Sequence, residues 1–107
     1  MSLPSRIEEI LLLAIWKLKD KAYGIAIRRR VEKETGLAWL SEAIYAPLSR
    51  LKEKGYVETI KAKNPTEKSG RPRVYYRLTP SGMERLISAQ KVNKSLWEGV
   101  PDLKKEQ

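Results

Sequence analysis

The sequence predicts a mainly α-helical domain with one small β-hairpin. Three observations indicate this class. Apolar residues recur every three or four positions in three segments before residue 55 and again after residue 80, which is the spacing of helices. Two short runs of β-prone residues lie between them and flank a polar stretch that contains proline and glycine. The 107 residues are enough for a single domain.

The first helix is predicted to begin after Ser5. Ser5 and Glu8 have the spacing of a capping box, in which each side chain binds the backbone N–H of the other residue. Apolar residues at helical spacing then form a core stripe: Ile7, Ile10, Leu11, Ala14 and Leu18. Four more apolar residues lie off this stripe: Leu12, Leu13, Ile15 and Trp16. This helix is therefore either buried on all sides by its own chain or covered by a partner subunit.

A second helix is predicted between the polar break at residues 20–21 and Gly36. Tyr23, Ile27 and Val31 recur at intervals of four and give it a buried face. Gly36 suits the left-handed residue that follows a helix. The apolar connector after it includes Trp39, which we expect in the core.

A third helix is expected after this connector, with Ser41 as a candidate N-cap. Its buried stripe is Ile44, Leu48 and Leu51, and it ends near residue 55. Pro47 would lie far enough inside the helix to clash with residue 43 if Ser41 is the cap, which leaves the start of the helix open. Two short helices joined by a tight connector are the order of a helix-turn-helix.

The remaining segments predict a wing and a final helix. Residues 56–60 and 74–78 are β-prone, and the stretch between them is polar and basic, which is typical of a hairpin. Thr79 and Pro80 then have the types preferred at a helix start. We therefore expect a winged helix-turn-helix at residues 4–79, a C-terminal helix at 80–99 that mediates dimerisation, and a frayed tail at 100–107.

Composition limits the function. The chain has no cysteine and no histidine, which removes disulfides, most metal sites and histidine-based catalysis, so we expect no metal, no cofactor and no catalytic residues. Its 22 Lys and Arg against 13 Asp and Glu give a net charge of +9, which indicates a polyanionic partner. Nucleic acid is the leading class and an anionic membrane surface the second.

The apolar stretches are too short for a membrane protein. The longest, Ile10 to Trp16, falls well below the roughly 20 residues that a span requires. The N-terminus also lacks the basic segment of a signal peptide. We expect a protein of the cytoplasm with no membrane partner.

Positive charge is concentrated between Arg50 and Arg77. This span has nine Lys and Arg and three Glu, which gives a net charge of +6. The third helix would enter a major groove of double-stranded DNA while the wing lies over flanking phosphates. The candidate DNA-binding residues are Arg28, Ser41, Tyr45, Ala46, Ser49, Arg50, Lys52, Lys61, Lys63, Lys68, Arg71 and Arg73. Three alternatives remain open: Tyr45 braces the wing, Arg28 lies on an ordinary solvated face, and Arg77 pairs within the fold.

A domain of this size buries a modest share of its surface, so a homodimer would cover the surplus apolar area. We expect the last helix to pack on the first helix of the partner. The candidate interface residues are Leu12, Ile15, Trp16, Met83, Leu86, Ile87, Leu96 and Trp97.

The chain resembles the PadR family of bacterial transcriptional regulators over almost its whole length. The resemblance lies in Ala22-Tyr23-Gly24-Ile25, in Ala43-Ile44-Tyr45 with Leu48, Arg50-Leu51 and Lys54-Gly55-Tyr56-Val57, in Gly70-Arg71, and in Tyr75-Tyr76-Arg77-Leu78-Thr79-Pro80-Ser81-Gly82. Glu42 and Pro47 depart from the family pattern. The resemblance implies a cytoplasmic bacterial regulator, and in small members of the family a hydrophobic cavity between subunits holds a planar compound. Trp16 and Trp97 are candidates for such a pocket, with simple packing as the alternative.

Together these features predict a homodimeric, sequence-specific DNA-binding regulator, which we expect to be a repressor on a near-palindromic operator. The main alternative is a winged-helix module whose basic face docks an acidic protein. An enzyme ranks third. Ser49 with Lys52, or Ser41 with Glu42, could be imagined as a catalytic pair, but neither pair has the third, orienting group that such a site uses.

Overall fold

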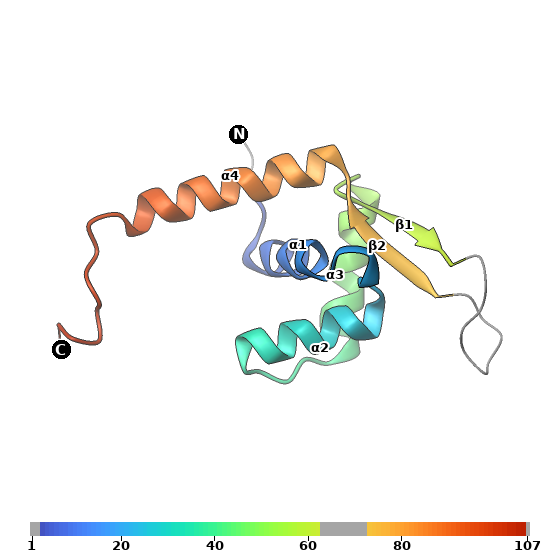
Figure 1. Cartoon of the computed structure of the whole chain (residues 1–107), viewed down its shortest axis with the longest axis horizontal. Coiled ribbons are helices and arrows are strands. Elements are labelled where there is room, and N and C mark those ends of the chain that lie inside the picture. The colour runs from blue at the N-terminus through green and yellow to red at the C-terminus, as the bar shows by residue number, and fades with distance from the viewer. Residues whose placement is uncertain (1–2, 63–72, 107) are drawn as a thin grey trace.

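Four α-helices and one antiparallel hairpin follow one another in the order that the sequence predicts (Figure 1). The computed structural model describes residues 3–62 and 73–106. Its elements are α1 (Arg6–Leu18), the short 3-10 helix η1 (Lys19–Lys21), α2 (Gly24–Thr35), α3 (Ser41–Glu53), β1 (Val57–Lys61), β2 (Val74–Leu78) and α4 (Pro80–Trp97). No helix in these two ranges is long and apolar enough to cross a bilayer.

Helix α1 is the centre of the core, and α2, α3, β2 and α4 all pack against it. Its Leu11, Leu12 and Ile15 are completely or almost completely buried. The other core residues come from the surrounding elements: Ala22, Ile27, Val31, Ile44, Leu48, Leu51, Val57 and Leu86. Trp39 packs against this cluster, as expected, and its indole N–H donates to Thr35 Oγ1 at 3.0 Å.

Three residues expected at a dimer interface are instead part of the core of the single chain. Leu12 and Ile15 lie off the stripe that the sequence predicts, but α1 is covered on several sides, so both are buried. Leu86 is also nearly buried, because the first half of α4 packs on α1. Leu13 and Trp16 of the same helix keep 38% and 45% of their surface exposed. Packing within the chain therefore buries two of the four apolar residues that lie off the core stripe of α1. The other two, Leu13 and Trp16, remain exposed.

The predicted capping box of α1 is present and extends to α3. Ser5 Oγ accepts from the Glu8 N–H, and Glu8 Oε1 accepts from the Ser5 N–H at 2.9 Å. The other carboxylate oxygen of Glu8 accepts from Lys54 Nζ at 2.9 Å. Burial raises the pKa of Glu8, but the Ser5 N–H and the Lys54 ammonium outweigh it, so the pKa is lowered overall. Glu8 thus links the first turn of α1 to the end of α3.

Helix α2 ends as predicted, whereas the expected cap of α3 is wrong. Gly36 has a φ of 71° and follows α2 in the left-handed conformation. Helix α3 begins at Ser41 with Leu40 in the N-cap position, and Ser41 makes no capping hydrogen bond. The Ser41 hydroxyl instead accepts from Arg28 at 2.9 Å, which joins α2 to α3.

Pro47 is accommodated inside α3. The proline has no N–H to donate to the carbonyl of Ala43, four residues earlier. Pro47 itself is buried. Ala43 is an exposed residue, which limits the cost of the hydrogen bond that the proline cannot donate. The helix continues through the proline at this cost.

The hairpin is fastened to the start of α2. Its register pairs Val57 with Leu78 and Lys61 with Val74. A further antiparallel bridge joins Tyr23 to Tyr75, and the Tyr76 N–H donates to the Ala22 carbonyl at 2.7 Å. The segment between η1 and α2 is therefore joined to β2 by one isolated bridge and one hydrogen bond, which fix the wing to the helix-turn-helix.

Helix α4 is held at its first turn and extends away from the body at its far end (Figure 1). Thr79 caps the helix by accepting from the Gly82 N–H, and its hydroxyl donates to the Gly55 carbonyl at 2.6 Å. A Cβ on Gly82 would lie 2.0 Å from the Tyr56 carbonyl oxygen, so the close approach requires glycine. Leu96 and Trp97, near the other end of α4, are 68% and 62% exposed.

Gly82→Ala should destabilise the fold. The new Cβ would meet backbone rather than a movable side chain, so the first turn of α4 must shift, with a loss of about 1–3 kcal/mol in the free energy of unfolding. Thermal and urea unfolding measure this loss. Ser81→Ala, an exposed change in the same turn, is the control and should cost less than about 0.5 kcal/mol. A Gly82→Ala protein as stable as the control would contradict the close contact.

Glu8→Gln should lower stability at neutral pH but not in acid. Because the folded state lowers the pKa of Glu8 from its ordinary 4.5, the carboxylate stabilises the fold above that pH, and the effect is lost as the pH falls through the folded value. We expect a loss of about 1–2 kcal/mol at pH 7 that shrinks below pH 4.5. Urea unfolding from pH 3 to pH 7 measures it, with the exposed Glu84→Gln as control. A loss that is the same at every pH would show that the charge of Glu8 is not responsible.

Candidate nucleic-acid interface

Helix α3 presents one polar face to solvent. Because Ile44, Leu48 and Leu51 are completely buried, the opposite face is open, as the sequence predicts. Each predicted outward-facing residue of this helix is exposed: Ser41, Tyr45, Ala46, Ser49, Arg50, Lys52 and Glu53. The face combines hydroxyl groups, a methyl group and two cations, which are the groups that contact base edges and phosphates in a major groove.

Tyr45 is the least free of these residues because it lies against the start of α2. A Cβ on Gly24 would come within 2.6 Å of the Tyr45 ring and its hydroxyl oxygen, so the absence of a side chain at Gly24 makes room for the tyrosine. The pKa of the Tyr76 phenol is raised, first by burial and then by the nearby Tyr45. Tyr45 therefore sits where α2, α3 and β2 meet. This geometry supports the bracing alternative, although 38% of the side chain remains exposed.

The described cations of the wing lie at the base of the hairpin. Lys61 is exposed at the end of β1. Arg73 comes directly before β2, and its guanidinium carbon lies 4.2 Å from the centroid of the Tyr23 ring. The predictions for Lys63, Lys68 and Arg71 fall on residues outside the described ranges.

Several other cations pair within the fold. Arg77 donates to Glu58 across the hairpin, which confirms the alternative that the sequence left open. Arg28 reaches Ser41 and also lies 3.8 Å from Glu32. These pairs support the view that Arg28 belongs to an ion-paired face of α2.

A second ion-pair cluster links α1 to α2. Arg30 and Lys17 both bind Glu34. Their hydrogen bonds, led by that of Lys17, lower the pKa of Glu34. Two of the three consecutive arginines of α2, Arg28 and Arg30, are therefore engaged by carboxylates of their own helix.

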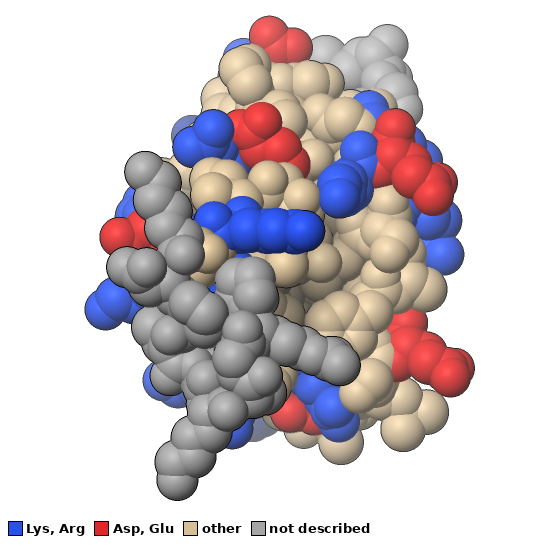
Figure 2. All heavy atoms as spheres, turned by 90° about the vertical axis from the view of Figure 1, so that its right-hand side faces the viewer, with Lys and Arg blue, Asp and Glu red and all other residues tan. Residues whose placement is uncertain are grey.

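The end of the molecule that carries the hairpin has mixed charge. Figure 2 shows this face, with separate blue side chains among uncharged surface and several red ones. Of the twelve charged residues between Arg50 and Arg77, four lie outside the described ranges: Lys63, Glu67, Lys68 and Arg71. The described part of the candidate interface is thus an exposed polar face on α3 with cations at its edges.

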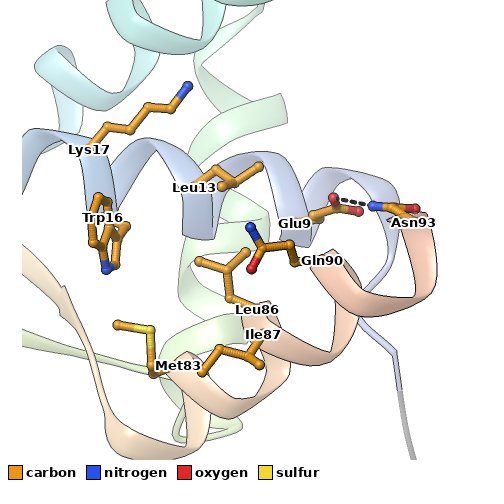
Figure 3. A pocket seen from close by; sticks show the side chains of 9 residues that line it. All are labelled: Glu9, Leu13, Trp16, Lys17, Met83, Leu86, Ile87, Gln90 and Asn93. Atoms are coloured by element: carbon orange, nitrogen blue, oxygen red, sulfur yellow. Dashed lines mark hydrogen bonds between the residues drawn. The ribbon is translucent and has the colours of Figure 1, made fainter. Parts of the chain in front are cut away.

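An apolar groove lies between α1 and α4. It has a volume of about 440 Å³, and its apolar lining is Leu13, Trp16, Met83, Leu86 and Ile87 (Figure 3). Asn93 donates to Glu9 at 2.8 Å and bridges the two helices at one end. The ammonium of Lys19 lies over the Trp16 ring, 3.1 Å from its centroid.

The two tryptophans expected to share a pocket are not brought together within one chain. Trp16 lines the groove, but Trp97 does not, because it lies near the end of α4. Sequence reasoning also missed two features of the site. The stack of Arg73 on Tyr23 left no signal, because it joins residues 50 positions apart. Leu13 appeared only as one of four residues off the core stripe of α1.

A family model and several solved structures point to one family. The model of the transcriptional regulator PadR-like family matches residues 12–88. A PadR family transcription regulator from Clostridium difficile is 24% identical, with a TM-score of 0.66 and coverage of 87% of this chain and 88% of that one. A PadR-like transcription factor from Bacteroides fragilis is 27% identical, with a TM-score of 0.69 and coverage of 88% and 85%. A PadR family regulator from Eggerthella lenta is 25% identical, with a TM-score of 0.65 and coverage of 85% and 77%. No curated protein sequence matches the chain.

Proposed function

The chain belongs to the PadR-like family of transcriptional regulators, and from this premise we propose that it is a repressor that binds a near-palindromic operator as a homodimer. Regulators of this family bind DNA and are not enzymes. The observation that carries the proposal is the exposed polar face of α3. This face points away from the core because the opposite side of the helix is buried. The place of action would be the bacterial cytoplasm, where such operators lie.

In this proposal, α3 enters the major groove and supplies sequence specificity. Ser49 can donate to or accept from a base edge, and Ala46 can contact a thymine methyl group. Arg50 and Lys52, further along the helix, would contact phosphates or guanine. All four residues are exposed, which supports their role. Tyr45 would add a contact with its exposed edge while its ring packs at Gly24.

The wing would supply affinity that does not depend on sequence. Lys61 and Arg73 lie at the base of the hairpin, and Lys63, Lys68 and Arg71 are assigned to the wing on their sequence positions. Each phosphate that such a cation neutralises releases counterions from the DNA. The bridge between Tyr23 and Tyr75 supports this role, because it fixes the wing relative to α3.

A homodimer would cover the apolar surface that one chain leaves open. Trp16 and Leu13 on α1, and Ile87, Leu96 and Trp97 on α4, are large apolar residues with more than a third of their surface exposed. We infer that α4 of one chain packs on α1 of the other about a two-fold axis. That arrangement places the two α3 helices on one side of the DNA, with half-sites about 10 bp apart or a multiple of that distance.

The groove between α1 and α4 supports release by a small molecule. Its volume lies in the range of about 300–1,000 Å³ that is usual for ligand pockets. Trp16 lines it, and Trp97 of the second chain would reach the same space in the proposed dimer. A planar hydrophobic compound bound there would alter the angle between α1 and α4, and so the distance between the reading helices.

Binding to duplex DNA should depend strongly on salt. A dimer that neutralises about 6–10 phosphates should give a plot of log affinity against log salt with a slope of roughly −5 to −9. Lys61→Ala should make the slope shallower by about 1–2, because the dimer carries this residue twice. Fluorescence anisotropy with a random duplex at several salt concentrations measures both slopes.

The control for this titration is Lys105→Ala, which removes an exposed lysine from the tail, far along the chain from α3 and the wing. Its slope should equal that of the wild type. A wild-type slope near zero would remove DNA as the partner. An acidic protein without phosphates that competes fully with the duplex would favour the protein-docking alternative.

Replacement of Leu96 and Trp97 by serine should convert the dimer to a monomer. Both side chains are largely exposed, so the fold of the single chain should persist. Each loses an apolar contact made twice in the dimer, so the dissociation constant should rise by about 100-fold or more. Light scattering at tens of micromolar measures the mass. The matched control replaces Lys91 and Lys94, two exposed residues of the same helix, by serine. A double-serine variant of Leu96 and Trp97 that is still a dimer would place the interface elsewhere.

A further inference from the structure

Arg73 and Tyr23 form a stack at the point where the wing meets the helix-turn-helix. The guanidinium carbon lies 4.2 Å from the ring centroid, within the range of a cation–π contact. Resting on the DNA-binding function proposed above, we propose that Tyr23 is a positioning residue, whose ring holds Arg73 in the orientation in which it binds a backbone phosphate.

The Tyr23 ring is itself fixed by contacts on the backbone and on its edge. Tyr23 occupies the N-cap position of α2, where its carbonyl accepts from the Ile27 N–H at 2.9 Å and its own N–H donates to the Lys21 carbonyl at 3.1 Å. Its backbone bridges to Tyr75 of β2. The two tyrosine rings meet edge to face, with centroids 5.8 Å apart and an interplanar angle of 84°. The platform under Arg73 is therefore rigid.

The backbone of Arg73 is also held in place. Its carbonyl accepts from the Ala62 N–H at 2.8 Å, which continues the hairpin by one pair beyond β1 and β2. With both the backbone and the far end of the side chain held, the arginine has already lost much of the rotamer freedom that binding a phosphate would remove.

A stacked guanidinium can still recognise an anion. Stacking engages the flat face of the group, whereas its N–H donors point outward in its plane and match the geometry of phosphate oxygens. A lysine at this position would present a point charge without that geometry.

The stack lies between the two parts of the proposed interface. Tyr23 precedes Gly24, which packs against Tyr45 of α3, and Arg73 precedes β2 of the wing. A DNA strand that passes from the groove occupied by α3 to the wing would cross this junction. Arg73 is thus placed to bind the phosphate between the specific contacts and the sequence-independent ones.

The test measures affinity for a random duplex at one salt concentration, by anisotropy, for a mutant cycle. Arg73→Ala and Tyr23→Leu should each weaken binding by about 3- to 10-fold. The double variant should be no more than about twofold weaker than Arg73→Ala alone, because Tyr23 acts only through Arg73. Tyr23→Phe keeps the ring and should bind within about twofold of the wild type. Fully additive losses, or a Phe variant as weak as the Leu variant, would overturn the positioning role.

Val74→Ala is the control at the same point of the hairpin. It trims an exposed apolar side chain next to Arg73 but keeps both tyrosine rings and the backbone bridge between them. Its loss should stay below about twofold. If Val74→Ala binds as weakly as Tyr23→Leu, the effect comes from loosening of the wing, and the inference is wrong.

An NMR measurement on the wild type keeps the proposal testable even if a variant fails to fold. The Arg73 side-chain protons should be shifted upfield by the ring current of Tyr23, and unshifted protons would overturn the stack. Failure of the broader function is distinguishable, because a wild type that binds no duplex rejects both proposals. If the wild type binds the duplex, Arg73→Ala binds it weakly and Tyr23→Leu binds it as tightly as the wild type, only the positioning role is rejected.

Discussion

The burial of α1 among the other elements is the constraint on which this fold depends. The chain has no cysteine and therefore no disulfide, and a cluster of buried apolar residues around α1 holds the domain together. Leu11, Leu12 and Ile15 supply the centre of that packing. Because α3 meets α1 through Ile44, Leu48 and Leu51, its orientation follows from the core. The polar face of α3 is exposed for the same reason, because it lies opposite this buried stripe.

Features that depend on residues close in the chain could be predicted from the sequence. The capping box at Ser5, the left-handed Gly36 and the Thr79–Pro80 helix start each involve three or four neighbouring residues, and all are present. The exposed polar face of α3 was predictable for the same reason, since one periodic stripe determines both the buried and the exposed side of the helix. The residue motifs within these helices and strands then carried the resemblance to the family.

Features that depend on contacts between distant segments could not be predicted in this way. Ser41 has the residue type of an N-cap, but its hydroxyl binds Arg28 of another helix. Leu12 and Ile15 lie off the predicted core stripe of α1, but both are buried because other elements pack on several sides of this helix. The sequence predicts Tyr23 on the buried face of the second helix and Tyr45 on the open face of the third. Only the approach of α2 to α3 and to β2 gives each ring its partner. Periodicity describes one helix at a time and says nothing of which helices meet.

The glycine contact at the first turn of α4 makes this helix a lever arm with a fixed base. Gly82 lies against Tyr56, which follows the end of α3 by three residues, so the direction of α4 is tied to that of α3. The 18 residues of α4 span about 27 Å, and a tilt of about 5° at the base moves the far end by about 2 Å. In the proposed two-fold dimer, joined through these far ends, the direction set at Gly82 would determine the distance between the two α3 helices. A change to this one small residue, remote from DNA, would then alter which operator spacing fits.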